Sequence, residues 1–396
     1  MGAHSRISRR AFLARAAGAA AGAGLGLGLA ARELRGASSH SQSQADEQPG
    51  GRMSHRRLGR TGVMISIIAG GGMPEVLFPR AIEAGINYWH AVGYWKPPKA
   101  LTSMPRDSFY CDMVIDHLEE EKAVEQFEAG LAKSGLEMVD FFKIHSRYRT
   151  PEEIKEQPGV LRAFEKLKRE KKTRWLAASQ HSNIGEVLSA CIESGFFDAI
   201  QPSYNPALEQ EVGAVIDLAK KHDVGVIAMK AMMGGPDQWA SGEQWRDSLE
   251  PYLRSSRDVA QALIRYALAR DGVTAVVPGV RSFEELEQAL AAARAPLSTR
   301  EEAALTALAG AVGGSYCRMC GRCEAACPRG IALADIFRYQ MYWRDYGDME
   351  RAVGLYAELP AERGAAGCDG CGNCRDACPY GRPVMPLLRE AHTMLA

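Results

Sequence analysis

The sequence predicts an α/β fold: a (β/α)8 barrel of the TIM type, followed by a small α-helical domain rich in cysteine. Two observations lead to this prediction. Apolar runs typical of buried parallel strands alternate with amphipathic runs over about 250 residues, which is the usual size of such a barrel. Eight of the ten cysteines lie in the last 80 of the 396 residues, which marks a second unit with its own chemistry.

The composition is that of a globular protein. Apolar residues make up 46% and charged residues 24% of the chain, which excludes wholesale disorder. Lys plus Arg and Asp plus Glu both number 48, so the formal charge is zero. Because nucleic-acid binders carry a strongly basic domain, this balance argues against a nucleic-acid partner.

The N-terminus has the layout of a removable export signal. Arg9 and Arg10 precede a weakly apolar stretch of Ala, Gly and Leu over residues 16–31. This layout resembles the twin-arginine signal, which directs proteins that fold before export. We therefore expect residues 1–37 to be a signal peptide and the mature protein to be periplasmic or otherwise exported.

Two other interpretations of this segment stay open, a mitochondrial-type presequence and a membrane anchor. The stretch is barely long enough for a span, which needs about 20 apolar residues, and Arg15 interrupts the segment. Residues 38–53 are rich in Ser, Gln and Gly and are expected to be a flexible linker. Since no other segment resembles a transmembrane helix, no membrane span is expected after signal cleavage.

The barrel is expected over residues 54–300, after a hairpin signal at residues 56–62. Eight runs are predicted as strands: residues 63–69, 86–91, 109–115, 139–145, 173–179, 199–204, 225–230 and 274–278. Six amphipathic runs are predicted as helices: residues 121–134, 160–172, 184–194, 209–222, 258–269 and 283–293. A doubly wound sheet is the alternative, but its usual Gly-x-Gly-x-x-Gly motif is absent.

The predicted strand order also locates the chemistry. In a barrel of this kind the functional residues lie at the carboxyl ends of the strands. We therefore expect a set of strand-end residues to meet at one mouth, namely residues 89–95, Met113, His145, residues 179–181, Tyr204, Asn205 and residues 230–235.

The cysteines follow one spacing twice, Cys-x2-Cys-x2-Cys-x3-Cys-Pro, which is typical of bacterial ferredoxins. In that pattern the fourth cysteine of each run binds the other cluster. The spacing therefore predicts two [4Fe–4S] clusters, one held by Cys317, Cys320, Cys323 and Cys378 and the other by Cys368, Cys371, Cys374 and Cys327. We expect residues 301–396 to form this ferredoxin-type domain.

Disulfides and zinc are the alternatives for these cysteines. An exported chain meets an oxidising compartment, and zinc sites also use closely spaced thiolates. Two copies of one four-cysteine spacing with a trailing proline are hard to explain by either. The remaining thiols, Cys111 and Cys191, fall in a predicted strand and a predicted helix and are expected to be buried and inert.

The barrel and its tail together resemble an aldo/keto reductase with a C-terminal ferredoxin module. The resemblance rests on residues 57–62, 84–89, 140–145 and 277–279 and on the Gln201-x-x-Tyr204-Asn205 motif. It implies NADP(H) bound across the barrel mouth, and a tetrad of Asp, Tyr, Lys and His. In the family reaction hydride moves from the nicotinamide to a carbonyl carbon, and Tyr protonates the carbonyl oxygen. A neighbouring Lys, held in place by Asp, lowers the pKa of the Tyr.

The chain departs from this tetrad. His90 stands at the Asp position and Met113 at the Lys position. Tyr94 is the candidate for the Tyr position, one residue short of the family spacing, and His145 matches the His. Trp95 competes with Tyr94.

Three residues are candidate substitutes. Lys143 lies two positions before His145, so both side chains should face the barrel interior, and Lys230 ends the seventh predicted strand. Either lysine would supply a cation. His90 would serve in acid–base chemistry because its ordinary pKa is near 6.5.

The resemblance also assigns residues to the nucleotide. Ser179 and Gln201 match positions that contact the nicotinamide carboxamide, and Arg281 lies where the family holds the adenosine phosphate. Glu285 and Ala289 replace polar partners that are usual beside that phosphate.

The sequence therefore predicts an exported iron–sulfur oxidoreductase of aldo/keto reductase type with a degenerate tetrad. A substrate or NADP(H) site in the barrel would be coupled to two [4Fe–4S] clusters, with a small molecule or a redox protein as partner. The alternative is a non-catalytic barrel that serves as a scaffold for an electron-transfer module.

Overall fold

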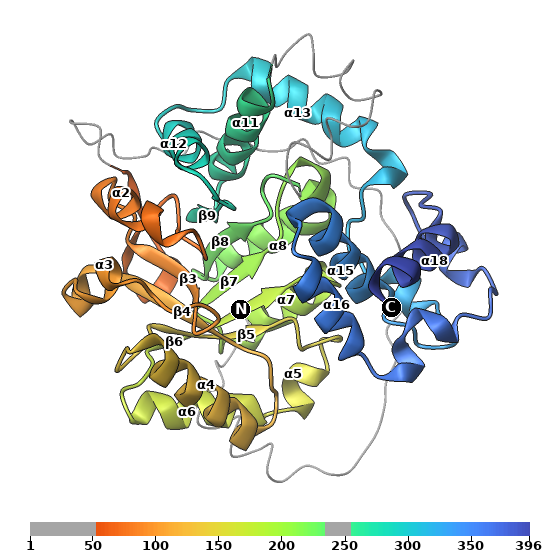
Figure 1. Cartoon of the computed structure of the whole chain (residues 1–396), viewed down its shortest axis with the longest axis horizontal. Helices are drawn as coiled ribbons and strands as arrows, with labels where there is room; N and C mark the ends of the chain where they lie inside the picture. Colours follow the sequence, from red (N-terminus) through yellow and green to blue (C-terminus); the bar gives the residue numbers. More distant parts are fainter. Residues whose placement is uncertain (1–52, 234–254) are drawn as a thin grey trace, which may run out of the picture.

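Parallel strands in sequence order form the barrel of this computed structural model, which describes residues 53–233 and 255–396 (Figure 1). The seven strands are β3 (Tyr88–Val92), β4 (Tyr110–Ile115), β5 (Phe141–His145), β6 (Trp175–Gln180), β7 (Ala199–Pro202), β8 (Gly225–Met229) and β9 (Ala275–Val277). Two isolated bridges, Ile68 to Val276 and Gly70 to Trp89, join the segment before β3 to both edge strands and complete the ring. The predicted parallel barrel is confirmed.

The first predicted strand, residues 63–69, serves two purposes rather than one. Its first half is β2 (Met64–Ser66), which pairs antiparallel with β1 (His55–Arg57). The short helix η1 (Gly59–Thr61) makes the turn, and Gly62 ends it with a left-handed φ of 75°. The second half leaves this hairpin and supplies the bridges that close the barrel. The expected hairpin is thus present, and the expected long strand is divided.

Helices surround the strands in the expected alternation (Figure 1). The main barrel helices are α4 (Glu120–Ser134), α6 (Gly159–Arg169), α7 (Ile184–Ser194), α8 (Glu209–Lys221), α11 (Ser256–Ala269) and α12 (Phe283–Ala292). Each agrees with a predicted helix to within a few residues. Three shorter helices were not predicted, namely α2 (Phe78–Glu83), α3 (Lys99–Thr102) and α5 (Glu153–Glu156). They lack the length over which apolar periodicity shows itself.

The barrel interior changes character along its axis. Its lower layer is apolar and includes Tyr88, Phe141, Ala177, Ala199, Ile227 and Ala275. Because side chains alternate between the two faces of a strand, the next inward residues are two positions further on. Those positions hold His90, Asp112, Lys143, Ser179 and Gln201. A packed base therefore supports a polar layer at the carboxyl ends of the strands.

The C-terminal part is a helical domain with its own core. After α13 (Thr299–Ala311) come α14 (Arg322–Ala325), α15 (Leu333–Tyr346), α16 (Met349–Ala357), α17 (Asn373–Asp376) and α18 (Val384–Leu395). The short helices α14 and α17 occupy matching places in the two cysteine runs. Each follows a left-handed glycine, Gly321 with φ 79° and Gly372 with φ 86°, directly after the second cysteine of its run. A side chain other than hydrogen would strain the backbone there.

This domain packs on the mouth side of the barrel. Arg149, after β5, forms a 2.6 Å ion pair with the buried Asp335 of α15. The backbone amide of Asn183, after β6, donates a 3.0 Å hydrogen bond to the carbonyl of Met319. Figure 1 shows α15 and α16 beside β5 and α7, between the barrel and α18. The helix that connects the two cysteine runs thus lies next to the strand ends.

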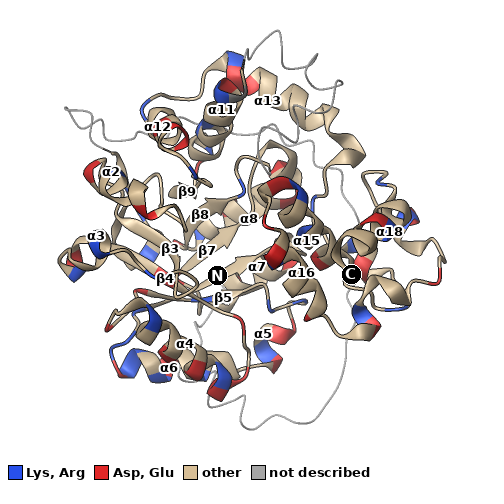
Figure 2. Cartoon of the chain, viewed as in Figure 1, with Lys and Arg blue, Asp and Glu red and all other residues tan. Residues whose placement is uncertain are grey.

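Charged side chains of both signs are interspersed over the outer helices, as Figure 2 shows for α4, α5 and α6. Within the described ranges, no helix is both long and apolar enough to cross a membrane.

Candidate functional site

A buried carboxylate organises the polar layer. Asp112 of β4 has no exposed surface, and Lys143 of β5 lies 2.6 Å from it with only 1% of its side chain exposed. The Tyr88 hydroxyl and the Ala91 backbone amide each donate to Asp112 at 2.9 Å. Burial opposes ionisation, but the Lys143 charge and then the contact with His90 outweigh it and hold the pKa of Asp112 well below its usual range. An Asp–Lys ion pair therefore exists in this site.

The expectation that Met113 lies at the mouth is wrong. Met113 points away from the interior, since its sulfur lies against Gly130 of α4. Its neighbour Asp112 points inward because side chains alternate along the strand. Lys143 faces the interior with His145, as expected from their spacing, and its Nζ also donates to Gln201 Oε1 at 2.6 Å. Asp112 was missed by sequence reasoning, although an Asp within an apolar strand was a usable signal.

His90 is held as a neutral imidazole. Its Nδ1 lies 2.6 Å from Lys143 Nζ and 3.2 Å from Asp112 Oδ2. An ammonium only donates, so the shorter contact assigns Nδ1 as the acceptor and leaves the proton on Nε2. Burial and then the Lys143 charge lower the pKa of His90. At neutral pH His90 therefore offers an N–H donor rather than a positive charge.

His145 meets two of the other predicted residues. Its Nδ1 lies 2.8 Å from the Ser179 hydroxyl, and its ring packs edge-on against His181 with 4.8 Å between centroids. Burial, followed by the charge of Arg338, lowers the pKa of His145 well below its ordinary value. The mouth thus gathers three imidazoles, from β3, β5 and the end of β6, and all three have lowered pKa values.

Tyr94 takes a different position. Its side chain is 43% exposed, and its hydroxyl donates to Asp116, just beyond β4. Burial and the Asp116 charge raise the pKa of Tyr94. The competing Trp95 donates from its indole nitrogen to the His90 carbonyl at 3.0 Å. No described contact joins Tyr94 to Lys143 or His145, so its assignment as proton donor stays a prediction.

Two other expected mouth residues differ in their roles. Tyr204 is buried away from the polar layer, where its hydroxyl donates to Glu209. Asn205 has no exposed surface and donates from Nδ2 to the Lys230 carbonyl at 3.1 Å and to the Tyr316 hydroxyl at 3.0 Å. Asn205 therefore joins the end of β8 to the C-terminal domain. Residues 234 and 235 of the predicted mouth lie outside the described residues.

The residues expected to hold the nicotinamide fit that group. Gln201 is buried, and while its oxygen accepts from Lys143, its Nε2 has no partner among the described residues. An orphaned buried donor of this kind suits a carboxamide oxygen. Ser179, paired with Gln201 in the β6–β7 register, adds a hydroxyl beside it.

The phosphate end is more self-contained. Arg281 is 69% exposed, and its guanidinium lies 3.7 Å from Glu285. The Glu285 carboxylate also accepts the Arg281 backbone amide at 2.6 Å. A carboxylate of the chain thus already faces the cation that would bind a phosphate, which weakens the expected hold on that end of a nucleotide.

None of the ten cysteines forms a disulfide, and eight of them line two hollows. The first hollow measures about 400 Å³, open solvent included, and its lining contains Cys317, Cys320, Cys323 and Cys378. The second measures about 310 Å³ on the same basis, and its lining contains Cys327, Cys368, Cys371 and Cys374. These two sets agree with the ligand sets expected from the spacing. Four thiols around each hollow fit a [4Fe–4S] cluster, which thiolates bind.

The two cysteine sets have different surroundings. We call the set of Cys317, Cys320, Cys323 and Cys378 the inner set, because its neighbours contact the barrel. Tyr316 receives the Asn205 hydrogen bond, and Tyr380 donates to Glu211 of α8. The outer set consists of Cys327, Cys368, Cys371 and Cys374, and two of these, Cys368 and Cys371, are exposed. One cluster position therefore adjoins the mouth and the other faces solvent.

Helix α15 adds residues that sequence reasoning did not place in the site. Tyr342 is buried, and Arg338 donates to its hydroxyl at 3.2 Å. Lys230 Nζ lies 5.3 Å from the centre of the Tyr342 ring. Burial raises the pKa of Tyr342, but the cations Arg338, Lys230 and Arg351 outweigh this effect. The pKa of Tyr342 is lowered to about 8, with Arg338 contributing most. The run of aromatic residues in 339–346 was a signal for packing but not for this contact.

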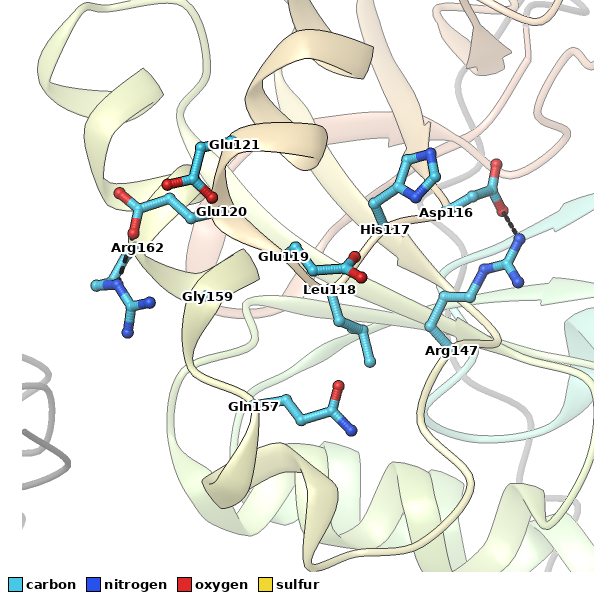
Figure 3. Close-up of a pocket in the computed structure, with 10 residues that line it drawn as sticks. All are labelled: Asp116, His117, Leu118, Glu119, Glu120, Glu121, Arg147, Gln157, Gly159 and Arg162. Carbon is cyan, nitrogen blue, oxygen red and sulfur yellow. Dashed lines mark hydrogen bonds and ion pairs between the residues drawn. The ribbon is translucent and has the colours of Figure 1, made fainter.

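A wide hollow of the barrel lies beside this site rather than in it (Figure 3). It measures about 1000 Å³, open solvent included, and lies between the loop after β4 and the start of α6. Figure 3 shows two ion pairs along it, Asp116 with Arg147 and Glu120 with Arg162. None of His90, Lys143 and His145 lines it, so this hollow does not locate the chemistry.

Comparisons with known proteins agree with this architecture. A model of the aldo/keto reductase family matches residues 108–309, and a model of the 4Fe-4S dicluster domain matches residues 316–383. No curated protein sequence matches the chain. A similar solved structure is the aldo-keto reductase AKR11C1 from Bacillus halodurans (holo form), at 20% identity and a TM-score of 0.54, covering 65% of this chain and 96% of that one.

These matches complete the assignment. The structural likeness supports the barrel fold, and the family match supports NADP(H) as the nucleotide for the site. The dicluster match supports two [4Fe–4S] clusters in the two hollows. The family match covers just over half of the 396 residues and begins after His90 and Tyr94. The chain belongs to the aldo/keto reductase family and carries a C-terminal 4Fe-4S dicluster domain.

Proposed function

We propose that the chain is an exported oxidoreductase in which a substrate at the barrel mouth exchanges electrons with the dicluster domain. The observation that carries this proposal is the contact between the mouth and the inner cysteine set. Asn205 bonds both to the Lys230 carbonyl and to Tyr316, the residue before Cys317. One-electron transfer is the chemistry that the two clusters supply when bound.

The tetrad of this protein is degenerate, and its roles are redistributed. Asp112 and Lys143 form a buried ion pair between β4 and β5. His90 of β3 stands at the expected Asp position and Met113 of β4 at the expected Lys position. His90 presents its Nε2–H, and His145, fixed by Ser179, presents its second nitrogen. Two neutral imidazoles of this kind orient a substrate oxygen by hydrogen bonds without adding charge.

Protonation needs a group with a pKa closer to neutral. Tyr94 has a raised pKa and bonds to Asp116, whereas the pKa of Tyr342 is lowered to about 8. Tyr342 is therefore a second candidate for the proton donor, in addition to Tyr94. Lys143 holds the Gln201 oxygen and so keeps Nε2 of that amide free for a carboxamide. NADP(H), where it binds, supplies hydride.

Anaerobic titration of the holoprotein with NADPH tests the proposal. We expect the visible absorbance of the clusters to bleach as electrons enter them. Gln201→Ala should weaken the response, and Gln210→Ala, at an exposed position of α8, is the matched control. If dithionite bleaches the clusters but NADPH neither bleaches them nor binds, the barrel is a scaffold for the dicluster domain.

Export is the second part of the proposal. The paired Arg9 and Arg10 before an apolar stretch support a twin-arginine signal, and that route passes folded proteins, so clusters would be inserted in the cytoplasm. The change of both arginines to Lys should leave the precursor in the cytoplasm. The control changes Arg32 and Arg35 to Lys instead, and normal export of the Arg9/Arg10 variant would refute the targeting.

A further inference from the structure

Lys230 has an unusual environment at the mouth. It directly follows β8, its backbone is left-handed with φ 54°, and its carbonyl accepts from Asn205. Its ammonium nitrogen is buried and has no hydrogen-bond partner among the described residues. A non-glycine residue in this conformation costs free energy, and such strain gathers at functional sites. An unpaired buried ammonium is costly as well.

The surroundings of Lys230 carry excess positive charge. Arg338 and Arg351 lie 5.6 and 5.0 Å from the centre of the Tyr342 ring, which Lys230 also contacts. Asp335 pairs with Arg338 but also with a second guanidinium, that of Arg149. One carboxylate therefore serves two arginines.

Two acidic groups of α15 raise the pKa of Lys230, Tyr342 more strongly than Asp345. Neither forms a hydrogen bond or an ion pair with the ammonium, and burial raises the pKa of Asp345 itself to about 7. Tyr346 also faces this region from α15, and its pKa is raised by burial. The net effect of burial and the arginines lowers the pKa of Lys230 to about 8.

Two further buried polar atoms, on the neighbouring strand ends, also lack partners. Ser203 Oγ and His181 Nδ1 are buried without hydrogen bonds among the described residues. The backbone of Ser203 forms a parallel β-bridge with Met229, the residue before Lys230. Burial, and then the charge of Lys230, lowers the pKa of His181. Three adjacent strand ends therefore each present an unsatisfied polar atom. Such groups in native structures normally have a partner.

We propose that Lys230, with Ser203 and His181, binds the carboxylate of a small organic acid. If the proposed function holds, the substrate is a carbonyl compound that carries a carboxylate. A bound carboxylate would accept hydrogen bonds from all three groups and would compensate the unpaired ammonium. A nucleotide phosphate shares this oxyanion chemistry, but Arg281, the expected phosphate residue, stands apart at the start of α12.

Isothermal titration calorimetry of the holoprotein with pyruvate tests the site. Pyruvamide has nearly the same shape without the charge and is the control ligand. We expect pyruvate to bind, pyruvamide to show no binding, and Lys230→Met to bind pyruvate at least about tenfold more weakly. Lys220→Met is the control variant, because Lys220 is exposed on α8 and pairs with Asp271.

Thermal unfolding keeps the test sharp. Lys230→Met removes an uncompensated buried charge, so its melting temperature should equal or exceed that of the wild type. The proposal is overturned if pyruvate gives no heat up to about 20 mM, if pyruvamide binds equally well, or if Lys230→Met binds as the wild type does. Loss of pyruvate binding in saturating NADP+ would assign the site to a nucleotide phosphate and also overturn it.

The outcome is separable from that of the proposed function. Calorimetry measures binding and needs no electron transfer. Pyruvate binding without bleaching by NADPH would leave the anion site standing and refute the redox coupling. Bleaching by NADPH without pyruvate binding would support the redox coupling and refute the anion site.

Discussion

The buried pair of Asp112 and Lys143 offers a direct test of how this barrel is held together. Asp112→Asn keeps an oxygen that accepts the Ala91 amide and removes the charge, which leaves Lys143 buried and uncompensated. Breaking a buried pair in this way costs about 3–5 kcal/mol. For a domain of this size each kcal/mol lowers the melting temperature by about 2–4 °C, so the expected loss is roughly 6–20 °C.

Lys143→Met should cost somewhat less, about 3 kcal/mol. Asp112 then stays buried without the Lys143 cation, but it keeps the Tyr88 hydroxyl and the Ala91 amide as donors. The double variant removes both charges and should be more stable than the sum of the single losses predicts, by about 1 kcal/mol or more. The assay is thermal unfolding of the holoprotein followed by circular dichroism.

The exposed pair of Lys220 and Asp271 is the control. Lys220→Met should change stability by less than about 1 kcal/mol, because surface ion pairs contribute little. If Asp112→Asn melts within about 2 °C of the wild type, or if the double variant shows the full sum, the pair does not organise the layer. The pH dependence has a fixed sign. The lowered pKa of Asp112 adds stability above about pH 4, its unfolded value, and this stability is lost as the pH falls further.

Two further predictions concern the cluster sets and the helix over the mouth. The variants Cys320→Ser (inner set) and Cys371→Ser (outer set) should each lose about one cluster of iron per chain. The control Cys191→Ala changes a buried thiol of α7 and should keep the full iron content. Unchanged iron in either serine variant would refute its ligand assignment. Ultraviolet difference spectra should show one tyrosine ionising near pH 8. Tyr342→Phe should remove that step, and the control Tyr346→Phe should retain it. A step that survives in Tyr342→Phe would contradict the effect of Arg338 and Lys230 on the pKa of Tyr342.

Periodicity and spacing were sufficient for the architecture. Parallel strands, barrel helices and both cysteine sets follow from patterns that repeat along the chain, and repeated patterns tolerate small errors of register. The first strand was predicted wrongly as one element, because alternation cannot show that a chain leaves one sheet and joins another at Ile67–Ile68.

The site was harder, because it depends on single residues. The predicted inward position on this strand was wrong by one residue: Met113 was expected at the mouth, whereas in the structure Asp112 points into the barrel. The partner of an inward residue is also set by strand stagger. Lys143 reaches Asp112, His90 and Gln201 from three different strands, and no local pattern encodes that.

The aromatic run of helix α15 indicated that this segment packs on the barrel, but its individual contacts lay beyond sequence reasoning. The contact of Tyr342 with Lys230 joins residues more than a hundred positions apart, and no local pattern specifies it. Long-range docking of this kind leaves little trace in one sequence.

The position of α15 has a consequence for the life of the enzyme. Its core neighbours include Cys323 and Cys327, so the helix is packed against the peptide that grips the iron. Metal supply and the shape of the barrel entrance are thereby linked in one piece of chain. A molecule that lacks its iron is therefore expected to lose the packing of α15 over the strand ends together with its cluster sites.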